Sequence, residues 1–294
     1  MLICSSSKAL IGVFCLLIVQ SASLSSTSEL FASKSLSRDE ASHVVDQILC
    51  PPRQERERNL AAMEAYGGVR GASITNDDPR TEYTYGEFPY HSVDLLVDLA
   101  QKYVRRDSGE RTNFVDLGSG SGRLVFYQAL TRNWEISGIE ISRQFHDLAL
   151  DSCAVGHAEG FFGSDTGQSD ASRLAFHNGN ALGVEDEFFK HTTQSSTAEV
   201  NERISRVLSN AHILFAYSSV WETERAQPFS QDLQAMILSS KWSQRLAELC
   251  PQGCVAITTD RALSPDFGWK LVDRADVDNP SLFGSTGYIS VLEK

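Results

Sequence analysis

Short apolar runs alternate with longer stretches of mixed polarity over most of the chain after residue 110. A run of four to six apolar residues bounded by turn residues is typical of a strand, whereas apolar residues spaced by three or four indicate a helix. Phe114, Val115 and Leu117 show the first pattern, and Val93, Leu96 and Ala100 show the second. We predict strands at residues 114–117, 135–142, 173–178, 212–217, 254–258, 269–272 and 288–292.

Helices are predicted between most of these strands and before the first of them. Pro51-Pro52 should interrupt the N-terminal helical region, because proline lacks the backbone donor that a helix interior needs. Residues rich in glycine and short polar side chains predict loops at 67–82 and 156–172. The predicted helices cover 38–66, a segment containing Val93 and Ala100, a segment starting at Arg123, and residues 143–155, 183–210 (with a loop at 192–198) and 229–249.

This order of elements predicts an α/β fold with a doubly wound parallel sheet. No helix is expected between the last two strands, so one of them should run antiparallel to the rest. The resulting expectation is a seven-strand Rossmann-like sheet with a helical N-terminal extension. Its boundaries are residues 39–82 for the helical extension and loop, and 83–294 for the sheet domain.

Three alternating glycines, Gly118, Gly120 and Gly122, follow the first strand directly, and the helical pattern opens at Arg123. Glycine lets the backbone turn tightly and leaves no Cβ between the chain and a ligand. The start of the helix offers free N–H groups and a partial positive charge. Strand, glycine turn and helix together therefore predict a nucleotide-binding corner.

Two acids distinguish the possible nucleotides. Asp116 lies two residues before the first glycine, and Glu140 lies at the end of the second strand, where a carboxylate can hold a ribose diol. A dinucleotide site has the pattern G-x-G-x-x-G, but Arg123 stands here in place of the last glycine. An NAD site and a glycine turn without a ligand remain the alternatives.

The acid before the glycines, the alternating glycines and the acid ending the second strand resemble class I S-adenosylmethionine-dependent methyltransferases. The resemblance implies that Asp116 faces the methionine amino group and that Glu140 holds the ribose. It also implies S-adenosyl-L-methionine as the cofactor and the seven-strand sheet described above.

Four segments together resemble the lysine methyltransferases of the disruptor-of-telomeric-silencing type, which lack a SET domain. They are residues 85–87 (Tyr-Gly-Glu), 114–122, 138–140 (Gly-Ile-Glu) and 179–182 (Gly-Asn-Ala-Leu), and the similarity covers about residues 80–260. The resemblance implies that Tyr85 and Glu87 help to close over the cofactor. The family's paired asparagines on the fourth strand are missing from residues 215–221, so a non-histone protein lysine is the expected substrate. Residues 118–123 also resemble the mitochondrial lysine methyltransferases of the ATP-synthase ring subunit.

The predicted site collects residues from the ends of four strands. Asn180 can bond an adenine edge and Ala181 can back the ring, with a plain turn as the alternative for Asn180. Tyr217, a half-buried aromatic in the alternative interpretation, and Ser218 end the fourth strand, where the methyl group must be delivered. The predicted cofactor-binding residues are Tyr85, Glu87, Asp116, Gly118, Ser119, Gly120, Gly122, Arg123, Glu140, Asn180 and Ala181, and the predicted catalytic residues are Tyr217 and Ser218; no metal site is expected.

Two other functions remain open. A small-molecule methyltransferase would use the insertion at 156–172 and the aromatic residues at 217–221 to cap a compact substrate. A cofactor-binding fold without activity would serve as an interaction module. Tyr85 and Glu87 would, in a further alternative, only cap the following helix.

Composition limits the possible partners. The formal net charge is −12 and no block of lysine and arginine is free of interleaved acids, so direct nucleic-acid binding is not expected. The expected partner is a protein substrate or a small molecule. Cys250 and Cys254 flank a short turn and either pair or serve as small apolar residues.

The N-terminus has the features of a targeting signal. Residues 9–19 form an apolar run that suits a signal peptide and is short for a membrane span. Residues 1–23 are therefore predicted to be a signal peptide, an uncleaved anchor being the alternative, and 24–38 form a serine-rich segment that resembles a transit peptide. We expect entry into the secretory pathway and delivery to a plastid or another organelle, with simple secretion or residence in the lumen as the alternative. No stable membrane span is expected after removal of the signal.

Overall fold

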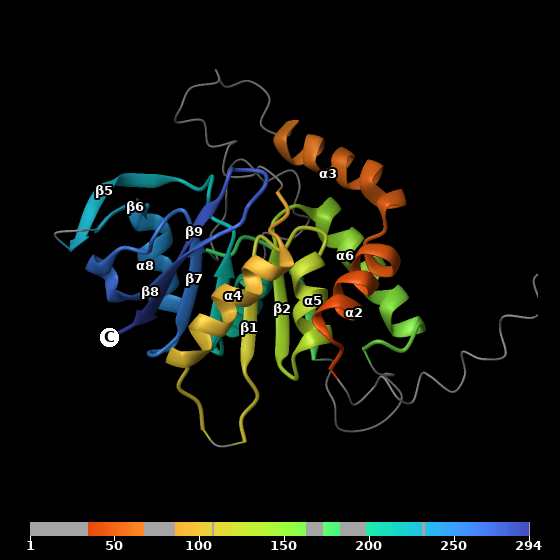
Figure 1. The fold of residues 1–294 in the computed structure, drawn as a ribbon, viewed down its shortest axis with the longest axis horizontal. Coiled ribbons are helices and arrows are strands. Elements are labelled where there is room, and N and C mark those ends of the chain that lie inside the picture. The colour runs from red at the N-terminus through yellow and green to blue at the C-terminus, as the bar shows by residue number, and fades with distance from the viewer. Residues whose placement is uncertain are drawn as a thin grey trace, which may run out of the picture.

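The computed structural model describes residues 35–67, 86–107, 109–162, 173–182, 198–230 and 233–293. Its centre is a seven-stranded sheet with the strand order β3-β2-β1-β4-β7-β9-β8, flanked by helices on both faces (Figure 1). The predicted signal and transit segments up to residue 34 lie outside the described residues. So do residues 68–82 of the predicted loop at 67–82, residues 163–172 of the predicted loop at 156–172, and residues 183–197 of the predicted helical segment at 183–210.

The strands of this sheet pair as the order of elements predicts. The first five pair in parallel, β9 runs antiparallel to β7, and β8 runs antiparallel to β9, so β8 points in the same direction as the first five. The carboxyl ends of the first five strands and of β8 therefore lie at one edge of the sheet, and β9 ends at the opposite edge. The strands are β1 Asn113–Leu117, β2 Glu135–Glu140, β3 Leu174–Asn178, β4 Ile213–Ala216, β7 Val255–Thr259, β8 Trp269–Val277 and β9 Ser285–Leu292.

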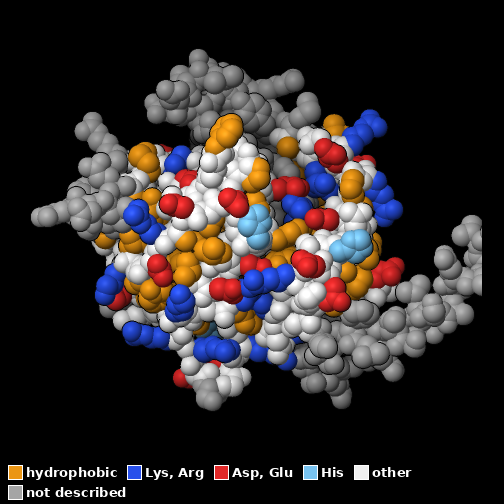
Figure 2. Space-filling model, in the orientation of Figure 1, with side chains coloured by type: hydrophobic (Ala, Val, Ile, Leu, Met, Phe, Trp, Pro, Cys, Tyr) orange, Lys and Arg blue, Asp and Glu red, His pale blue; other side chains and the backbone are white. Residues whose placement is uncertain are grey.

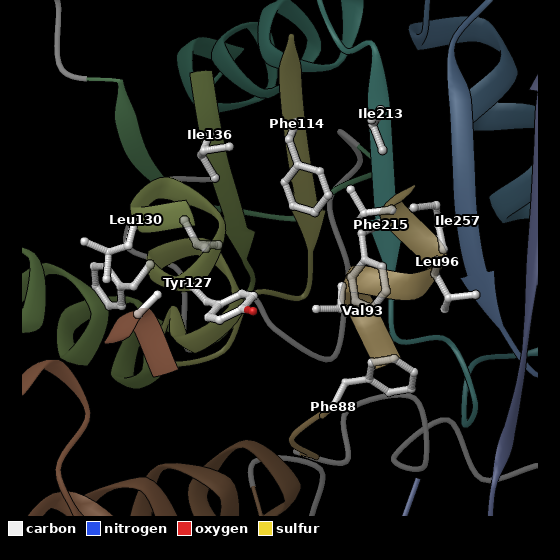
Figure 3. Packing of buried hydrophobic residues seen from close by; sticks show 14 of the residues in the cluster. Phe88, Val93, Leu96, Phe114, Tyr127, Leu130, Ile136, Ile213, Phe215 and Ile257 are labelled. Carbon is white, nitrogen blue, oxygen red and sulfur yellow. The ribbon is translucent and has the colours of Figure 1, made fainter. Parts of the chain in front are cut away.

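Alternate residues of each strand enter separate cores on the two faces. Phe114, Phe215 and Ile257 point from neighbouring strands toward α4 (Tyr90–Ala100), as the close view shows (Figure 3). The following residues in each strand, such as Val115 and Ala216, pack in the core on the other face with α7 (Ala198–Ser209) and α8 (Ser240–Leu249). This burial on both faces explains why the strands read as apolar runs rather than alternating ones.

Two further helices flank the nucleotide-binding corner predicted from the sequence. Helix α5 (Arg123–Thr131) follows the glycine turn and packs in the same core as α4. Helix α6 (Arg143–Ala158) follows β2 and contacts β3. The sequence predicted both starting residues correctly.

The N-terminal extension is helical, as predicted, and breaks at the two prolines. It comprises α2 (Arg38–Val44), a π-helical turn η1 (Val45–Leu49), a 3₁₀ turn η2 (Pro52–Gln54) and α3 (Glu55–Gly67). Ser37 and Glu40 form a capping box that starts α2. Val45 and Leu49 enter the main core and η1 contacts α5 and α6, so the extension is part of the folded domain.

The predicted helix at 229–249 is wrong over its first half. Residues Thr223–Ser230 (β5) and Leu233–Leu238 (β6) form an antiparallel hairpin, and the helix begins only at Ser240. Ala235 and Ile237 are buried while Met236 between them is 40% exposed, which is a period of two. A bridge between Ile237 and Ala262 holds the hairpin against the chain after β7, so tertiary pairing overrides the helical spacing of the leucines.

Among the described residues, no helix is both long and apolar enough to cross a membrane. Cys250 and Cys254 are buried and form no disulfide in this structure. Their packing in the core with α7 and α8 agrees with the interpretation as small apolar residues.

Candidate functional site

The glycine turn between β1 and α5 adopts a backbone that only glycine accepts readily. Gly118, Gly120 and Gly122 have φ values of +76°, +54° and +86°. At Gly122 a Cβ would also lie 2.8 Å from the Phe176 ring and 2.9 Å from the Phe126 ring. Both the turn and its close packing therefore require glycine, as the sequence predicted.

Glu140 connects the glycine turn to the end of β2. One carboxylate oxygen accepts the Gly120 N–H at 2.8 Å and the other accepts the Ser142 N–H at 2.7 Å. Burial raises the pKa of Glu140, and these backbone donors partly offset the increase. A carboxylate has about four lone-pair sites, so Glu140 can accept further hydrogen bonds from a ligand diol.

Asp116 lies beside Glu140, because the two residues end adjacent parallel strands and Asp116 pairs in register with Gly138. The side chain is nearly fully buried. Burial, and then the negative charge of Glu140, raise the pKa of Asp116 to about 8. Within the described part of the chain no hydrogen-bond donor contacts this carboxyl, so its position favours a positively charged ligand group.

The turn also carries an unsatisfied hydroxyl. The Ser119 Oγ is buried and has no hydrogen-bond partner among the described residues. A Cβ at Gly138 would come within 2.7 Å of this oxygen, so Ser119 has room only because residue 138 is glycine. A buried polar atom without a partner is costly unless a ligand or water satisfies it.

An aromatic wall stands close to the same turn. A Cβ at Gly118 would lie 3.9 Å from the Trp221 ring, which in turn stacks on Trp242 with a centroid separation of 4.0 Å. The aromatic residues at 217–221 were predicted to border the site, and this contact places Trp221 next to the glycines.

Asn180 and Ala181 follow β3 at the same edge of the sheet. The Asn180 Oδ1 accepts the Leu182 N–H at 2.8 Å, which is the turn geometry of the alternative interpretation. Ala181 is buried against the core with Ile139 and Leu182. The Asn180 amide N–H₂ keeps its capacity to donate, whereas Asn178 uses its amide on the backbone carbonyls of Glu140 and Ile141.

Tyr217 and Ser218 have different environments at the end of β4. The Tyr217 ring packs against Phe88, and Gly86 lies so close that a Cβ there would be 2.9 Å from the ring. Ser218 is fully buried, donates to the Thr259 carbonyl oxygen and accepts the Thr259 N–H. Ser218 therefore joins β4 to β7, and its predicted catalytic role does not fit this geometry.

Arg123 and Glu87 contact each other. The Arg123 guanidinium bonds Glu87 and also pairs with Asp46 at 2.6 Å, while its Cζ lies 4.9 Å from the Tyr90 ring centroid. These contacts hold the loop before α4 and the N-terminal extension against the start of α5. They show no direct role in ligand binding for either residue, and Tyr85 lies outside the described residues.

Sequence reasoning missed the residues behind Tyr217. The Asn279 Nδ2 donates to the Tyr217 hydroxyl at 2.9 Å and to the Ser285 Oγ at 2.8 Å. Ser285 in turn donates to Asp260, a residue with φ of +58°. Asn279-Pro280 reads as a turn signal in the sequence, and no local pattern indicates a contact across 62 residues.

The residues at this edge fit a nucleoside with a cationic amino acid portion. The glycine turn leaves room for close approach, Ser119 offers an unsatisfied hydroxyl, and two buried carboxyls lie where an ammonium and a diol would be held. No group of three or more metal-binding side chains occurs within the described ranges.

Comparison with known proteins adds a family resemblance. The profile of the family described as "Histone methylation protein DOT1" matches residues 70–183, which is less than half of the chain and includes the glycine turn and Glu140. No curated protein matches this sequence. The chain thus resembles seven-strand S-adenosylmethionine-dependent methyltransferases of the DOT1 type, as the motifs indicate.

Solved structures resemble the chain only distantly. An RNA methyltransferase from Salinibacter ruber in complex with S-adenosyl-L-homocysteine is 19% identical, with 71% of this chain and 95% of that chain covered and a TM-score of 0.38. Magnesium protoporphyrin IX methyltransferase from Synechocystis PCC 6803 with bound S-adenosylmethionine is 10% identical, with 88% and 99% covered and a TM-score of 0.41. Fibrillarin from Aeropyrum pernix with natively bound S-adenosyl-L-methionine is 12% identical, with 66% and 74% covered and a TM-score of 0.36.

Proposed function

We propose that this protein is an S-adenosylmethionine-dependent methyltransferase that methylates a lysine side chain of a non-histone protein. The observation that carries the proposal is the pair of buried acids, Asp116 and Glu140, at adjacent strand ends around a turn of three left-handed glycines. The match of residues 70–183 to the DOT1 family supports lysine as the acceptor.

In this proposal each site residue has one task. Ionised Asp116 pairs with the ammonium group of the cofactor, and Glu140 accepts hydrogen bonds from its ribose hydroxyls. Asn180 donates to the adenine edge, and Ala181 packs beside the ring. When bound, S-adenosylmethionine supplies an electrophilic methyl group on a sulfonium.

The acceptor nitrogen has to be neutral to attack a methyl group. Tyr217, Phe88 and Trp221 give the acceptor side of the site an apolar and aromatic lining, which disfavours a charged ammonium by desolvation. Aromatic faces also attract the methylated cation, by about 0.5–2 kcal/mol. Alignment of donor and acceptor supplies most of the rate, and intramolecular models give roughly 7–11 kcal/mol for this effect.

The compartment follows from the N-terminal pattern. We propose that residues 1–23 direct the chain into the secretory pathway and that residues 24–38 direct it onward to an organelle that receives S-adenosylmethionine. A fluorescent protein fused to residues 1–40 should leave the cytosol. Fluorescence that stays in the cytosol would contradict this part of the proposal.

The acceptor class is tested by transfer of radiolabel. Incubation of the protein and labelled S-adenosylmethionine with an organelle extract should label a protein band, and acid hydrolysis of that band should release methyllysine. A Glu140→Gln variant should leave the band unlabelled. Label in methylarginine would contradict the lysine assignment. Label confined to the small-molecule fraction would support the second candidate, a small-molecule methyltransferase, and absence of cofactor binding would favour the interaction module.

A further inference from the structure

The turn between β8 and β9 lies at the same edge of the sheet as the candidate site. Strand β8 runs parallel to β1, β4 and β7, so its carboxyl end and the following residues 278–284 meet the ends of those strands. In Figure 1 the dark blue turn crosses the upper edge, above the ends of β7 and β9. A single side chain, Asn279, connects this turn to Tyr217.

Asn279 also fixes the shape of the turn. Its backbone carbonyl accepts the N–H groups of Leu282 and Gly284 at 3.0 Å each, and its Oδ1 accepts the Ser281 N–H at 3.3 Å. The Asn279 side chain is buried at the base, with its amide shared between Tyr217 and Ser285. The turn is therefore held by internal hydrogen bonds at the point where it meets the site.

The tip of this turn presents large apolar side chains to solvent. Phe283 is fully exposed and Leu282 is 43% exposed. Phe283 has a φ of +60°, which costs an ordinary L-residue roughly 1–2 kcal/mol, and it makes no compensating burial in the chain itself. A fully exposed aromatic side chain on a hydrogen-bonded turn is suited to anchor a partner, since its burial removes a large apolar surface from water.

The charges around the tip are acidic. Asp276, near the end of β8, and Asp278, directly after it, carry the charges nearest to the tip in sequence, and residues 275–285 contain no lysine or arginine. The Asp278 side chain is 87% exposed, and its carboxylate lies 3.4 Å from the His91 Nε2. On the face shown in Figure 2, apolar and acidic side chains lie side by side toward the upper edge of the molecule. A partner with basic residues beside an apolar one complements such a surface.

We propose that Phe283 and Leu282 form the docking surface for a basic segment of the protein acceptor, with an apolar side chain of that segment packed on Phe283. This inference rests on the proposed function and specifies how the acceptor is recognised. Asn279 makes the docking surface continuous with Tyr217, so a segment anchored at the tip runs toward the reacting position.

The test uses the full-length chain, Phe283→Ser and a matched control, Leu150→Ser. Leu150 is an exposed leucine on α6, 45% accessible, that has no part in the proposed site. Both substitutions leave the core intact, so thermal unfolding should stay unchanged. Calorimetry with S-adenosylmethionine should give the same dissociation constant for all three proteins, within about twofold.

Binding to the acceptor is then measured on an array of synthetic lysine peptides with and without neighbouring Arg, Leu and Phe residues, in the presence of S-adenosyl-L-homocysteine. The unsubstituted protein and Leu150→Ser should bind basic peptides that carry an apolar residue near the lysine, and Phe283→Ser should lose at least about tenfold in binding. Equal binding by Phe283→Ser, or no binding of any peptide by the unsubstituted protein, would overturn the docking surface. A dimer of the unsubstituted protein in analytical ultracentrifugation that Phe283→Ser abolishes would also overturn the proposal, because the tip would then contact a second copy of the chain. Loss of cofactor binding in the unsubstituted protein would instead contradict the proposed function itself.

Discussion

At the scale of single residues, the account depends on two carboxyl groups that the sheet brings together although 23 residues separate them in sequence. Both carboxylate oxygens of Glu140 accept hydrogen bonds from backbone N–H groups, whereas the Asp116 carboxyl accepts none from the residues that the structure describes. The first is thus held in place for neutral donors, and the second is left for a cation.

Replacement of Glu140 by glutamine should weaken S-adenosylmethionine binding by roughly 10–100-fold, because hydrogen bonds to a charged acceptor contribute about 1.5–3 kcal/mol. Calorimetric titration measures the change. Glu202→Gln is the matched control, since Glu202 is an exposed acid on α7 that pairs with Arg206 of the same helix. An unchanged dissociation constant for Glu140→Gln would show that the ribose is held elsewhere.

The affinity for S-adenosylmethionine should depend on pH through Asp116. Its pKa of about 8 means that the carboxyl carries a proton at neutral pH before a cation arrives. An ammonium lowers that pKa, so binding releases the proton, and affinity should fall as pH decreases below 8, by up to about tenfold per unit. Nearby Glu140, whose pKa is also raised, adds in the same direction.

Asp116→Asn should bind S-adenosylmethionine more weakly at pH 8 and lose most of this pH dependence.

The same substitution should stabilise the protein without ligand at alkaline pH. The folded-state pKa of Asp116 lies above its unfolded value of 3.8, so its protonation favours folding at low pH and this contribution is lost as pH rises through about 8. Urea unfolding at pH 6 and pH 9 measures the difference, and an equal loss of stability with pH in both proteins would contradict the assignment.

At the scale of elements, the glycine turn combines a left-handed backbone with close packing. A comparison of Gly122 in this turn with Gly253, which lies elsewhere, separates the two contributions to the unfolding free energy. Gly122 and Gly253 have nearly the same φ, +86° and +85°, but a Cβ at Gly122 meets two phenylalanine rings and one at Gly253 meets nothing within 4 Å. Gly253→Ala should cost about 1–2 kcal/mol of unfolding free energy from strain alone. Gly122→Ala should cost about 1–3 kcal/mol more from overpacking. Equal losses in chemical denaturation would mean that the packing around Phe176 adapts freely.

Arg123 joins three elements, because it contacts Glu87 before α4, Asp46 in η1 and Tyr90 in α4. Arg123→Met should destabilise the protein by about 1–3 kcal/mol, since Asp46 loses its ion pair with Arg123 and Glu87 is left with the longer pair to Arg58, at 3.6 Å. A double-mutant cycle with Asp46→Asn should show coupling between the two positions. Additive effects would indicate that the extension is held mainly by the apolar contacts of Val45 and Leu49.

The sequence was sufficient for the elements whose signal is local. The apolar runs place the strands, and the three glycines with Asp116 and Glu140 place the nucleotide corner, because each depends on neighbours within a few residues. The β5–β6 hairpin was missed because Ile237 is placed by its bridge to Ala262 rather than by its own spacing. The structural contact of Ser218 is not readable from its neighbours, because its hydrogen-bond partner, Thr259, lies on another strand.

At the scale of the whole molecule, the fold collects the predicted site residues at one edge of the sheet. The ends of β1, β2 and β3 supply predicted cofactor residues and the end of β4 supplies Tyr217, while the β8–β9 turn adds Asn279 and Phe283 from the far end of the chain. The net charge of −12 disfavours nucleic acid as the direct partner and favours a basic protein segment. The role of the N-terminal signal remains a separate prediction for the fusion experiment.

The central claim is that the edge formed by β1 and β2 binds S-adenosylmethionine. Calorimetric titration of the full-length protein with S-adenosylmethionine and, separately, with NAD tests it most directly. The account predicts saturable binding of S-adenosylmethionine that Glu140→Gln weakens, and no binding of NAD at the same concentrations. Saturable binding of NAD alone, or no heat with either ligand, would contradict it.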